Sequence, residues 1–281
     1  MAVPLLPSYR VPVEKMRVFN ELKEAILEQV EYRELMFRMT QRDLMLRYKQ
    51  TVMGVGWAVV MPLVNTAIFS IIFTRVARID TGGIPYPLFA YSGLLAWNFF
   101  ASSLRFAATS LTSNTTLVTK IFFPREVLPI SAVLVTLVDT VIGFGVLMLM
   151  MAYYRVPVTS AVLLLPVVVA VEFVFTCAMS LVLAMTNLFY RDVKYLLEFV
   201  IAVWMFATSV VYPLDQIDGR LGVVLRFNPM VPIIDAFRSV VVAGRVPNLT
   251  SFAAVAVLSF LALCVAWVGF HRAELQFAEN I

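Results

Sequence analysis

The chain has 281 residues, of which 61% are hydrophobic and only 14% charged, whereas soluble domains carry about 45–50% apolar and about 25% charged residues. Its net charge of +4 comes without a basic run of the kind that binds nucleic acid, so composition excludes a nucleic-acid-binding protein. The apolar residues lie in long blocks, each near the roughly 20 residues that a helix needs to cross a bilayer. We therefore expect an all-α integral membrane protein.

Residues 1–53 are expected to form a cytoplasmic segment, because they mix basic and acidic residues and contain no apolar core of a signal peptide. Residues 14–31 show helical spacing of apolar side chains, which predicts an amphipathic helix. Residues 33–50 continue with alternating apolar and basic residues, a pattern typical of a helix lying in the membrane interface. The alternative is an ordinary cytosolic helix.

A six-span transmembrane domain is predicted at 54–270, followed by a cytoplasmic tail at 271–281. The expected spans are residues 54–74, 87–108, 127–153, 161–188, 195–213 and 250–270. Pro62 and Pro166 are expected kink sites. Lys and Arg are concentrated in the segments that this topology places inside, so the positive-inside rule predicts that both termini are cytoplasmic.

The segment between the second and third spans predicts a short exposed helix. Ser113, Asn114 and Thr115 favour a helix start, and Pro124 ends the helix. An apolar stripe of Leu117, Val118 and Ile121 indicates a helix that fits a groove in a partner protein. The alternative is a small helix resting on the membrane.

The stretch 214–249 contains another short helix, which follows Pro229 and is too short and too polar to span. Asp235 and Arg238 are interleaved with its apolar residues, including Phe237. We expect a re-entrant element in the outer leaflet. The alternative is a helix lying on the outer surface.

The sequence lacks the residues of common catalytic sites. No glycine precedes a lysine, so no phosphate-binding loop of the G-x-x-x-x-G-K-[ST] type is present. The only histidine, His271, lies beyond the last span and is expected to be solvated; Cys177 and Cys264 lie in apolar blocks without metal-ligand spacing. We therefore expect a conduit rather than an enzyme, without a metal or cofactor of its own.

Two carboxylates lie near the middle of predicted spans, Asp139 in the third and Glu172 in the fourth. A charge at the bilayer centre is costly, so neither side chain is expected to face lipid. They can line a water-filled path or hold helices together, and ion coupling is a third possibility. Arg105 and Glu198 lie at similar depth near the cytoplasmic ends of the second and fifth spans, which predicts an ion pair.

Aromatic residues are abundant, with 22 Phe, 10 Tyr and 4 Trp, and their rings can contact the C–H faces of sugars. The alternative role is packing against lipid or other helices. Helical spacing places Tyr195, Phe199 and Phe206 on one face of the fifth span, and Phe99 and Phe106 on one face of the second. These five residues and Trp57, which is also a candidate interface anchor, form the expected substrate path.

Several motifs occur in an order that resembles the permease subunits of ATP-binding-cassette exporters for O-antigen, capsule and teichoic acid, the type-2 permease family. They are Asp43-Leu-Met-Leu-Arg47-Tyr48-Lys49-Gln-Thr51, Pro85-Tyr86-Pro87-Leu-Phe-Ala-Tyr91-Ser-Gly93-Leu-Leu-Ala-Trp97, Phe123-Pro124-Arg125, Tyr190-Arg191-Asp192-Val-Lys194, Tyr212-Pro213 and Asn228-Pro229-Met230. The likeness covers about residues 33–281.

The resemblance implies a homodimer in the bacterial inner membrane, bound to two copies of a separate ATPase subunit that bind ATP and Mg. It implies an interface helix with Asp43, Arg47, Tyr48 and Lys49, a coupling element at 114–123, and a periplasmic gate at 229–243. The coupling residues would be Asn114, Leu117, Lys120, Ile121, Phe123 and Arg125, and the gate residues Pro229, Asp235, Phe237 and Arg238.

The substrate that the resemblance implies is a glycan linked to undecaprenyl diphosphate, with O-antigen as the first expectation. One alternative is ATP-driven export of a smaller lipid or a drug. Another is an ion-coupled carrier or channel that uses Asp139 or Glu172, and a third is a membrane enzyme acting on polyprenyl lipids.

Overall fold

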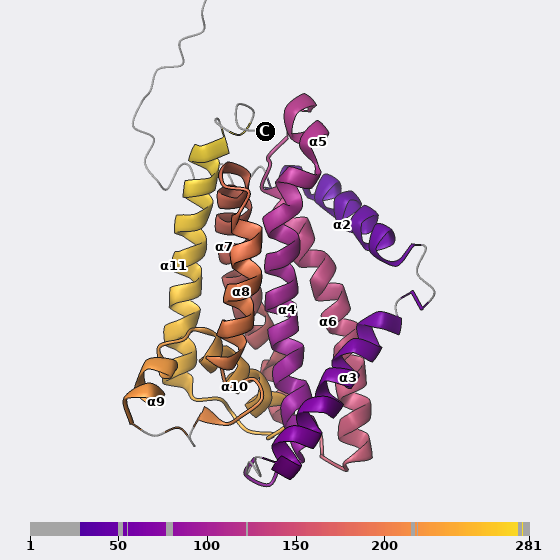
Figure 1. The fold of residues 1–281 in the computed structure, drawn as a ribbon, viewed down its shortest axis with the longest axis vertical. Coiled ribbons are helices and arrows are strands. Elements are labelled where there is room, and N and C mark those ends of the chain that lie inside the picture. Colours follow the sequence, from indigo (N-terminus) through magenta and orange to yellow (C-terminus); the bar gives the residue numbers. More distant parts are fainter. Residues whose placement is uncertain are drawn as a thin grey trace, which may run out of the picture.

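The computed structural model describes residues 29–49, 53–54, 56–76, 81–121, 123–214, 217, 219–274 and 277. The helix expected over 14–31 lies outside this part of the chain, apart from its last residues. All regular structure in the described part is helical (Figure 1). The elements are α2 (Arg33–Tyr48), α3 (Gly56–Ile71), a π-helical turn η1 (Ile72–Val76), α4 (Tyr86–Ser113), α5 (Thr115–Lys120), α6 (Val127–Tyr153), a 3₁₀ turn η2 (Ser160–Leu164), α7 (Leu165–Phe189), α8 (Val193–Phe206), α9 (Gly219–Arg226), α10 (Met230–Val241) and α11 (Leu249–Glu274).

Helix α4 is the centre of the bundle and packs against α3, α6, α7, α8 and α10. Most of its side chains are buried. Small residues such as Gly93, Ala101 and Ser103 let neighbouring backbones come close, as is common between helices in membranes. The hydroxyl of Ser103 also forms a hydrogen bond with that of Thr136 on α6. The central helix of the bundle therefore carries small and polar residues and is not the most hydrophobic helix.

Four helical segments of the described chain are long and apolar enough to cross a bilayer: Gly56–Thr74, Val127–Tyr153, Ser160–Phe189 and Leu249–Glu274. They make the protein a multi-pass membrane protein. The other two predicted spans coincide with α4, which has 28 residues but is less apolar, and with α8, which has only 14. Since length and composition single out four helices, the six-span topology stays a prediction.

Helix α8 ends at Phe206, before the predicted boundary at residue 213. The side chain of Asn228, which precedes α10, donates hydrogen bonds to the carbonyl of Ala207 at 2.9 Å and to the Thr208 hydroxyl at 2.7 Å. These bonds satisfy polar groups just past the helix end, where the intrahelical ladder stops. A residue from a distant segment thus stabilises the end of the helix, and the apolar character of the following residues does not reveal it.

The two expected kink prolines occupy different positions. Pro62 lies inside α3. Pro166 lies in the first turn of α7, directly after the 3₁₀ turn, where a missing N–H costs little. Pro166 therefore marks the start of a helix rather than a kink within one.

The two ends of the bundle carry different short helices (Figure 1). Helix α5 and the end of α11 lie at one end, and α9 and α10 lie at the other. Helix α10 is the short helix expected after Pro229, and its buried residues pack against α4, α7 and α11. It is thus inserted among the long helices.

Candidate functional site

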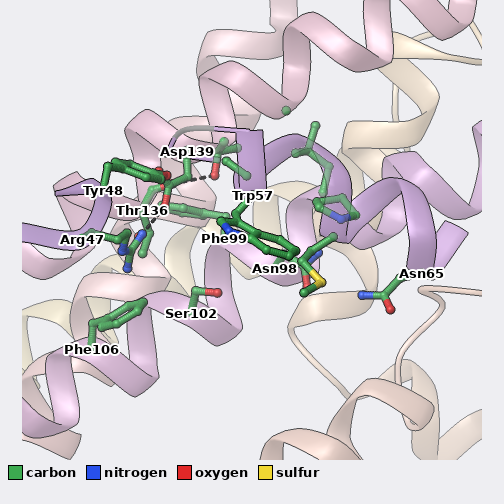
Figure 2. Close-up of a pocket in the computed structure, with 17 residues that line it drawn as sticks. Arg47, Tyr48, Trp57, Asn65, Asn98, Phe99, Ser102, Phe106, Thr136 and Asp139 are labelled. Atoms are coloured by element: carbon green, nitrogen blue, oxygen red, sulfur yellow. Dashed lines mark hydrogen bonds and ion pairs between the residues drawn. The ribbon is translucent and has the colours of Figure 1, made fainter. Parts of the chain in front are cut away.

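A cleft of about 360 Å³ lies between α2, α3, α4 and α6 (Figure 2). It brings together residues from two groups that the sequence analysis had kept apart, the interface helix and the substrate path. Its lining includes Arg47, Tyr48, Trp57, Asn98, Phe99, Ser102, Phe106, Thr136 and Asp139. The cleft therefore combines aromatic rings, hydroxyl groups and charges in one place.

The charged centre of the cleft is formed by three helices. Arg47 of α2 forms an ion pair with Asp139 of α6, and the Tyr48 hydroxyl donates a hydrogen bond to the same carboxylate. The Arg47 guanidinium lies over the Phe106 ring of α4, 3.9 Å from its centroid (Figure 2). Burial, together with the bond to Asp139, raises the pKa of Tyr48 to about 12, so this hydroxyl keeps its proton.

This arrangement identifies the partners of Asp139, which the sequence analysis left open. The carboxylate compensates the charge of Arg47 and connects α6 to α2, while its side chain is 22% exposed and borders the cleft. It therefore links helices and lines the cleft at once. An unpaired acidic residue within a span and a basic residue in a neighbouring amphipathic segment were the available signals for this pairing.

A second cleft of about 520 Å³ continues along α2 and shares Arg47 and Phe106 with the first. Its walls carry Arg42, the hydroxyls of Thr109, Ser110 and Ser113, and apolar residues of α6. At its far end, Arg42 Nη2 donates to Asn114 Oδ1 at 3.0 Å. The two clefts thus extend along the side of α2 that faces α4 and α6, as far as the start of α5.

The predicted path residues fall into separate groups. Trp57, Phe99 and Phe106 line the first cleft, although Phe99 is only 2% exposed and also packs against Val133 and Cys177. The aromatic side chains of α8 lie elsewhere on its exposed surface: Tyr195 is 68%, Phe199 68% and Phe206 56% exposed. In the described part of the chain, the structure therefore does not join the two aromatic faces.

Glu172 lies apart from both groups. Its side chain is 2% exposed in α7, and its Oε1 atom has no hydrogen-bond partner among the described residues. It borders neither of the clefts beneath α2. The structure thus separates Glu172 from Asp139, which the sequence analysis had treated alike.

The coupling element forms α5 and the loop after it. Asn114 precedes the helix, Leu117 is half-buried, and only Lys120 and Ile121 of the six expected coupling residues are exposed. Phe123 is buried in a cluster with Phe270 and Phe277. Ile121 and Lys120 therefore lie on the outward surface of this element.

Arg125 connects the coupling element to the end of α11. Its guanidinium donates to the carbonyl oxygen of Val118 at 3.2 Å and to that of Glu274 at 2.6 Å. Its backbone N–H donates to the Glu274 carboxylate at 3.1 Å. Arg125 thus positions α5 instead of facing outward.

The expected gate residues are held tightly. Pro229 directly precedes α10, and Phe237 is 2% exposed. The Arg238 guanidinium donates to the carbonyl oxygens of Ser209 at 2.9 Å and Val210 at 3.1 Å, pairs with Asp235 at 3.3 Å, and lies 3.6 Å from the centroid of the Phe89 ring. The arginine therefore joins α10 to α4 and to the chain after α8.

Gly93 makes this approach possible, and the sequence analysis assigned it no role. A Cβ atom at Gly93 would lie 2.3 Å from the Val210 carbonyl oxygen and 2.6 Å from Arg238 Nη2. Only a hydrogen fits in that space. A glycine in the middle of a long predicted helix was the signal for such a contact.

Two further predictions can be compared with the structure. The pair of Arg105 and Glu198 is confirmed, with Nε 2.9 Å from the carboxylate. The expectation that His271 is solvated is wrong, because its side chain is 29% exposed and its Nδ1 lies 3.4 Å from the buried carboxylate of Glu126. Its position at the end of α11, packed against the start of α6, explains this difference.

Comparison with known proteins identifies relatives along nearly the whole chain. A family model described as ABC-2 type transporter matches residues 34–242. The chain is 32% identical over 260 residues to the O-antigen export system permease protein RfbA of Myxococcus xanthus, covering 91% of this chain and 98% of that protein. It is 28% identical to RfbA of Klebsiella pneumoniae, covering 88% and 94%, and 21% identical to the polysialic acid transport protein KpsM of Escherichia coli, covering 83% and 91%.

Proposed function

Because the chain belongs to the ABC-2 type transporter family, we propose that it exports an undecaprenyl-diphosphate-linked O-antigen polysaccharide from the cytoplasm to the periplasm. Within this family it is a transport subunit that lacks an ATPase domain, so ATP and Mg are bound by a separate ATPase subunit, of which two copies act on a homodimer of the chain. The similarity to O-antigen export permeases, which covers 88–91% of this chain, carries the choice of substrate.

The proposed topology has six spans, with α4 and α8 completing the four apolar helices. The end of the bundle that carries α5 and the end of α11 faces the cytoplasm, and the end that carries α9 and α10 faces the periplasm. Helix α2 has no buried residues, and Phe37 and Leu46 are exposed on it. Such a helix suits the cytoplasmic membrane interface.

The contacts of α5 support ATP-driven coupling. Lys120, the last residue of this six-residue helix, and Ile121 directly after it are exposed. Asn114 connects the start of the helix to α2, and Arg125 connects the helix to α11. A displacement of α5 by a partner would therefore reach two other helices through hydrogen bonds. This connection is the structural observation on which the proposed mechanism depends.

The substrate path would use the clefts under α2 and the exposed face of α8. Rings of Trp57 and Phe106 are available for contact with sugars, while hydroxyls and charged groups can bind polar substituents. Tyr195, Phe199 and Phe206 are exposed in one protomer, which suits a path completed by the second protomer of a dimer.

An ion-coupled carrier is the rival from another class. Its ion site would be Glu172, which borders neither cleft beneath α2, or Asp139, whose carboxylate is already paired with Arg47 and bonded by Tyr48. The geometry therefore favours a structural role for the charge of Asp139. Transport by the purified chain alone, driven by an ion gradient, would decide for the rival.

A test of the coupling role is Ile121→Asp, with Ile121→Leu as the matched control. Because a charge on the exposed apolar surface of α5 would oppose docking, we expect the aspartate variant to abolish export and ATPase co-purification while inserting normally into the membrane. The leucine variant should retain both. Normal export by Ile121→Asp would contradict the coupling assignment.

A test of the substrate path is Tyr195→Ala combined with Phe199→Ala, compared with Leu196→Ala, which removes an equally exposed side chain on a different face of α8. The aromatic double variant should slow export several-fold while ATPase association persists, and lipid-linked glycan should accumulate inside. Equal export by both variants would remove the aromatic face from the path.

A further inference from the structure

Three metal-ligating side chains meet where the start of α6 packs against the end of α11. They are Glu126, His271 and Glu274, and one potential ligand atom from each lies within 4.8 Å of the others. The group lies outside both clefts. His271 and Glu274 lie three positions apart on α11, but sequence spacing does not reveal the group because Glu126 comes from a distant part of the chain.

Glu126 is the feature that points to a ligand. Its side chain is 1% exposed, and its Oε2 atom has no hydrogen-bond partner among the described residues. Its other oxygen, Oε1, lies 3.4 Å from His271 Nδ1. Since buried carboxylates need a compensating charge or hydrogen bonds, the protein contacts present account for only part of its requirement.

The His271–Glu126 hydrogen bond is long, and the spacing of the ligand atoms is also compatible with a bound cation. His271 Nδ1 lies 3.4 Å from Glu126 Oε1 and 3.9 Å from Glu274 Oε2. A charge-assisted hydrogen bond is about 2.7–2.9 Å long. Bonds of about 2.0 Å in a tetrahedral zinc site instead place ligand atoms about 3.3 Å apart. The 3.4 Å separation already matches this spacing, and the 3.9 Å separation would have to shorten by about 0.6 Å.

Glu274 is oriented toward the centre of this group by Arg125. The backbone N–H of Arg125 donates to Glu274 Oε1 at 3.1 Å, and its guanidinium lies 3.8 Å from the same oxygen. The second oxygen, Oε2, faces the imidazole of His271 at 3.9 Å. One oxygen of the carboxylate is thus held by the protein and the other is available to a cation.

We propose that Glu126, His271 and Glu274 bind one divalent transition-metal ion, with zinc as the expected class, at the junction of α6 and α11. An imidazole nitrogen with two carboxylate oxygens suits zinc, whereas Mg²⁺ and Ca²⁺ prefer sites built from oxygen atoms alone. A three-residue site leaves the fourth position for water. The ion would neutralise the buried Glu126 and join the two helices.

An ion bound at this place would also affect the structure around α5. Arg125, next to Glu126 in the chain, also donates to the Val118 carbonyl oxygen of α5. A cation that fixes Glu274 would fix this arginine and, through it, α5. The site would therefore stiffen the region that carries the exposed Ile121, independently of which molecule is exported.

The test uses the full-length chain purified with an affinity tag that contains no histidine. Because His271 is the only histidine, any imidazole nitrogen on the metal must come from it. Titration calorimetry with Zn²⁺ should show one ion per protomer. Pulsed electron paramagnetic resonance with Cu²⁺ in place of Zn²⁺ should show the signature of one imidazole.

Variants then identify the carboxylate ligands. Glu126→Gln and His271→Gln should each weaken Zn²⁺ binding by at least about tenfold. Glu198→Gln, a carboxamide change on the exposed pair of α8, serves as control and should bind like the unchanged protein. Zn²⁺ should also raise the thermal unfolding temperature of the unchanged protein, but not that of Glu126→Gln.

The absence of an imidazole signature in the unchanged protein would overturn the proposal, even if the variants failed to fold. So would equal Zn²⁺ affinity of Glu126→Gln and the unchanged protein. Thermal stability that responds to pH but not to Zn²⁺ would show a proton-sharing cluster instead of a metal site. None of these results bears on export, because the proposal does not depend on the substrate.

Discussion

Two arginines of this protein have the same kinds of neighbours in different surroundings. Arg47 pairs with Asp139 and lies over the ring of Phe106, and Arg238 pairs with Asp235 and lies over the ring of Phe89. Arg47 is 20% exposed beside a cleft, whereas Arg238 is 7% exposed at the packed end of the bundle.

The Arg47 group and the Arg238 group, each an arginine with its acidic and aromatic neighbours, connect different parts of the protein. Arg47 joins α2, which has no buried residues, to α4 and α6 through side chains alone. Arg238 has its acidic partner on its own helix and donates to backbone carbonyls of other segments. The Arg47 group thus attaches a peripheral helix, and the Arg238 group belongs to the core. Movement should therefore be easier at the first.

The largest effect is expected from Arg238→Met. The substitution leaves the carbonyls of Ser209 and Val210 without their donor and Asp235 without its charge partner, so the folded state should lose about 3 kcal/mol or more. Thermal unfolding and the yield of monodisperse protein in detergent measure it. Arg220→Met, on an exposed arginine of α9, should change neither; a stable Arg238→Met would contradict the core role.

A slightly smaller loss is expected from Gly93→Ala. The added methyl group would meet the Val210 carbonyl and the Arg238 guanidinium, and such overpacking costs about 1–3 kcal/mol. The matched control is Gly145→Ala in α6, where no atom lies within 4 Å of the new Cβ. Unfolding temperatures of the two variants should differ clearly; equal values would show that α4 and residues 209–210 are not in close contact.

Asp139→Asn should have a moderate effect on stability and a larger one on export. It removes the charge partner of Arg47 at a partly exposed site, so a loss of about 1 kcal/mol is expected. Hydrogen exchange should accelerate in 33–48 but not in α10. The exchanged pair Arg47→Asp with Asp139→Arg should partly restore export, and Glu34→Gln on the same helix should leave both readouts unchanged.

The smallest effect is expected at Arg105 and Glu198, a pair whose side chains are 39% and 58% exposed. Reversing either charge should impair assembly slightly, and reversing both should partly restore it. Exposed pairs couple by about 0.2–1 kcal/mol, which a double-mutant cycle on unfolding temperature can resolve. A coupling energy as large as the loss expected for Arg238→Met would show that the exposure of an ion pair does not determine its contribution to stability.

Local pattern predicted much of the fold. Helical spacing and apolar length identified α2, α5, α6, α7, α10 and α11 near their observed bounds. The same periodicity placed Arg105 and Glu198 at one depth, which sufficed to predict their pairing because their helices are neighbours. Composition alone also indicated a membrane protein, since the cost of exposing so many apolar residues to water does not depend on how they pack.

Other features depend on which segments become neighbours. The partner of Asp139 lies 92 positions earlier in the chain, and the end of α8 is set by Asn228. Glu126 meets His271 only because the start of α6 lies beside the end of α11. Hydropathy and periodicity describe each helix by itself, so they predict which helices form and which face is apolar. The contacts between helices arise from packing of the whole bundle, and only the tertiary structure decides them.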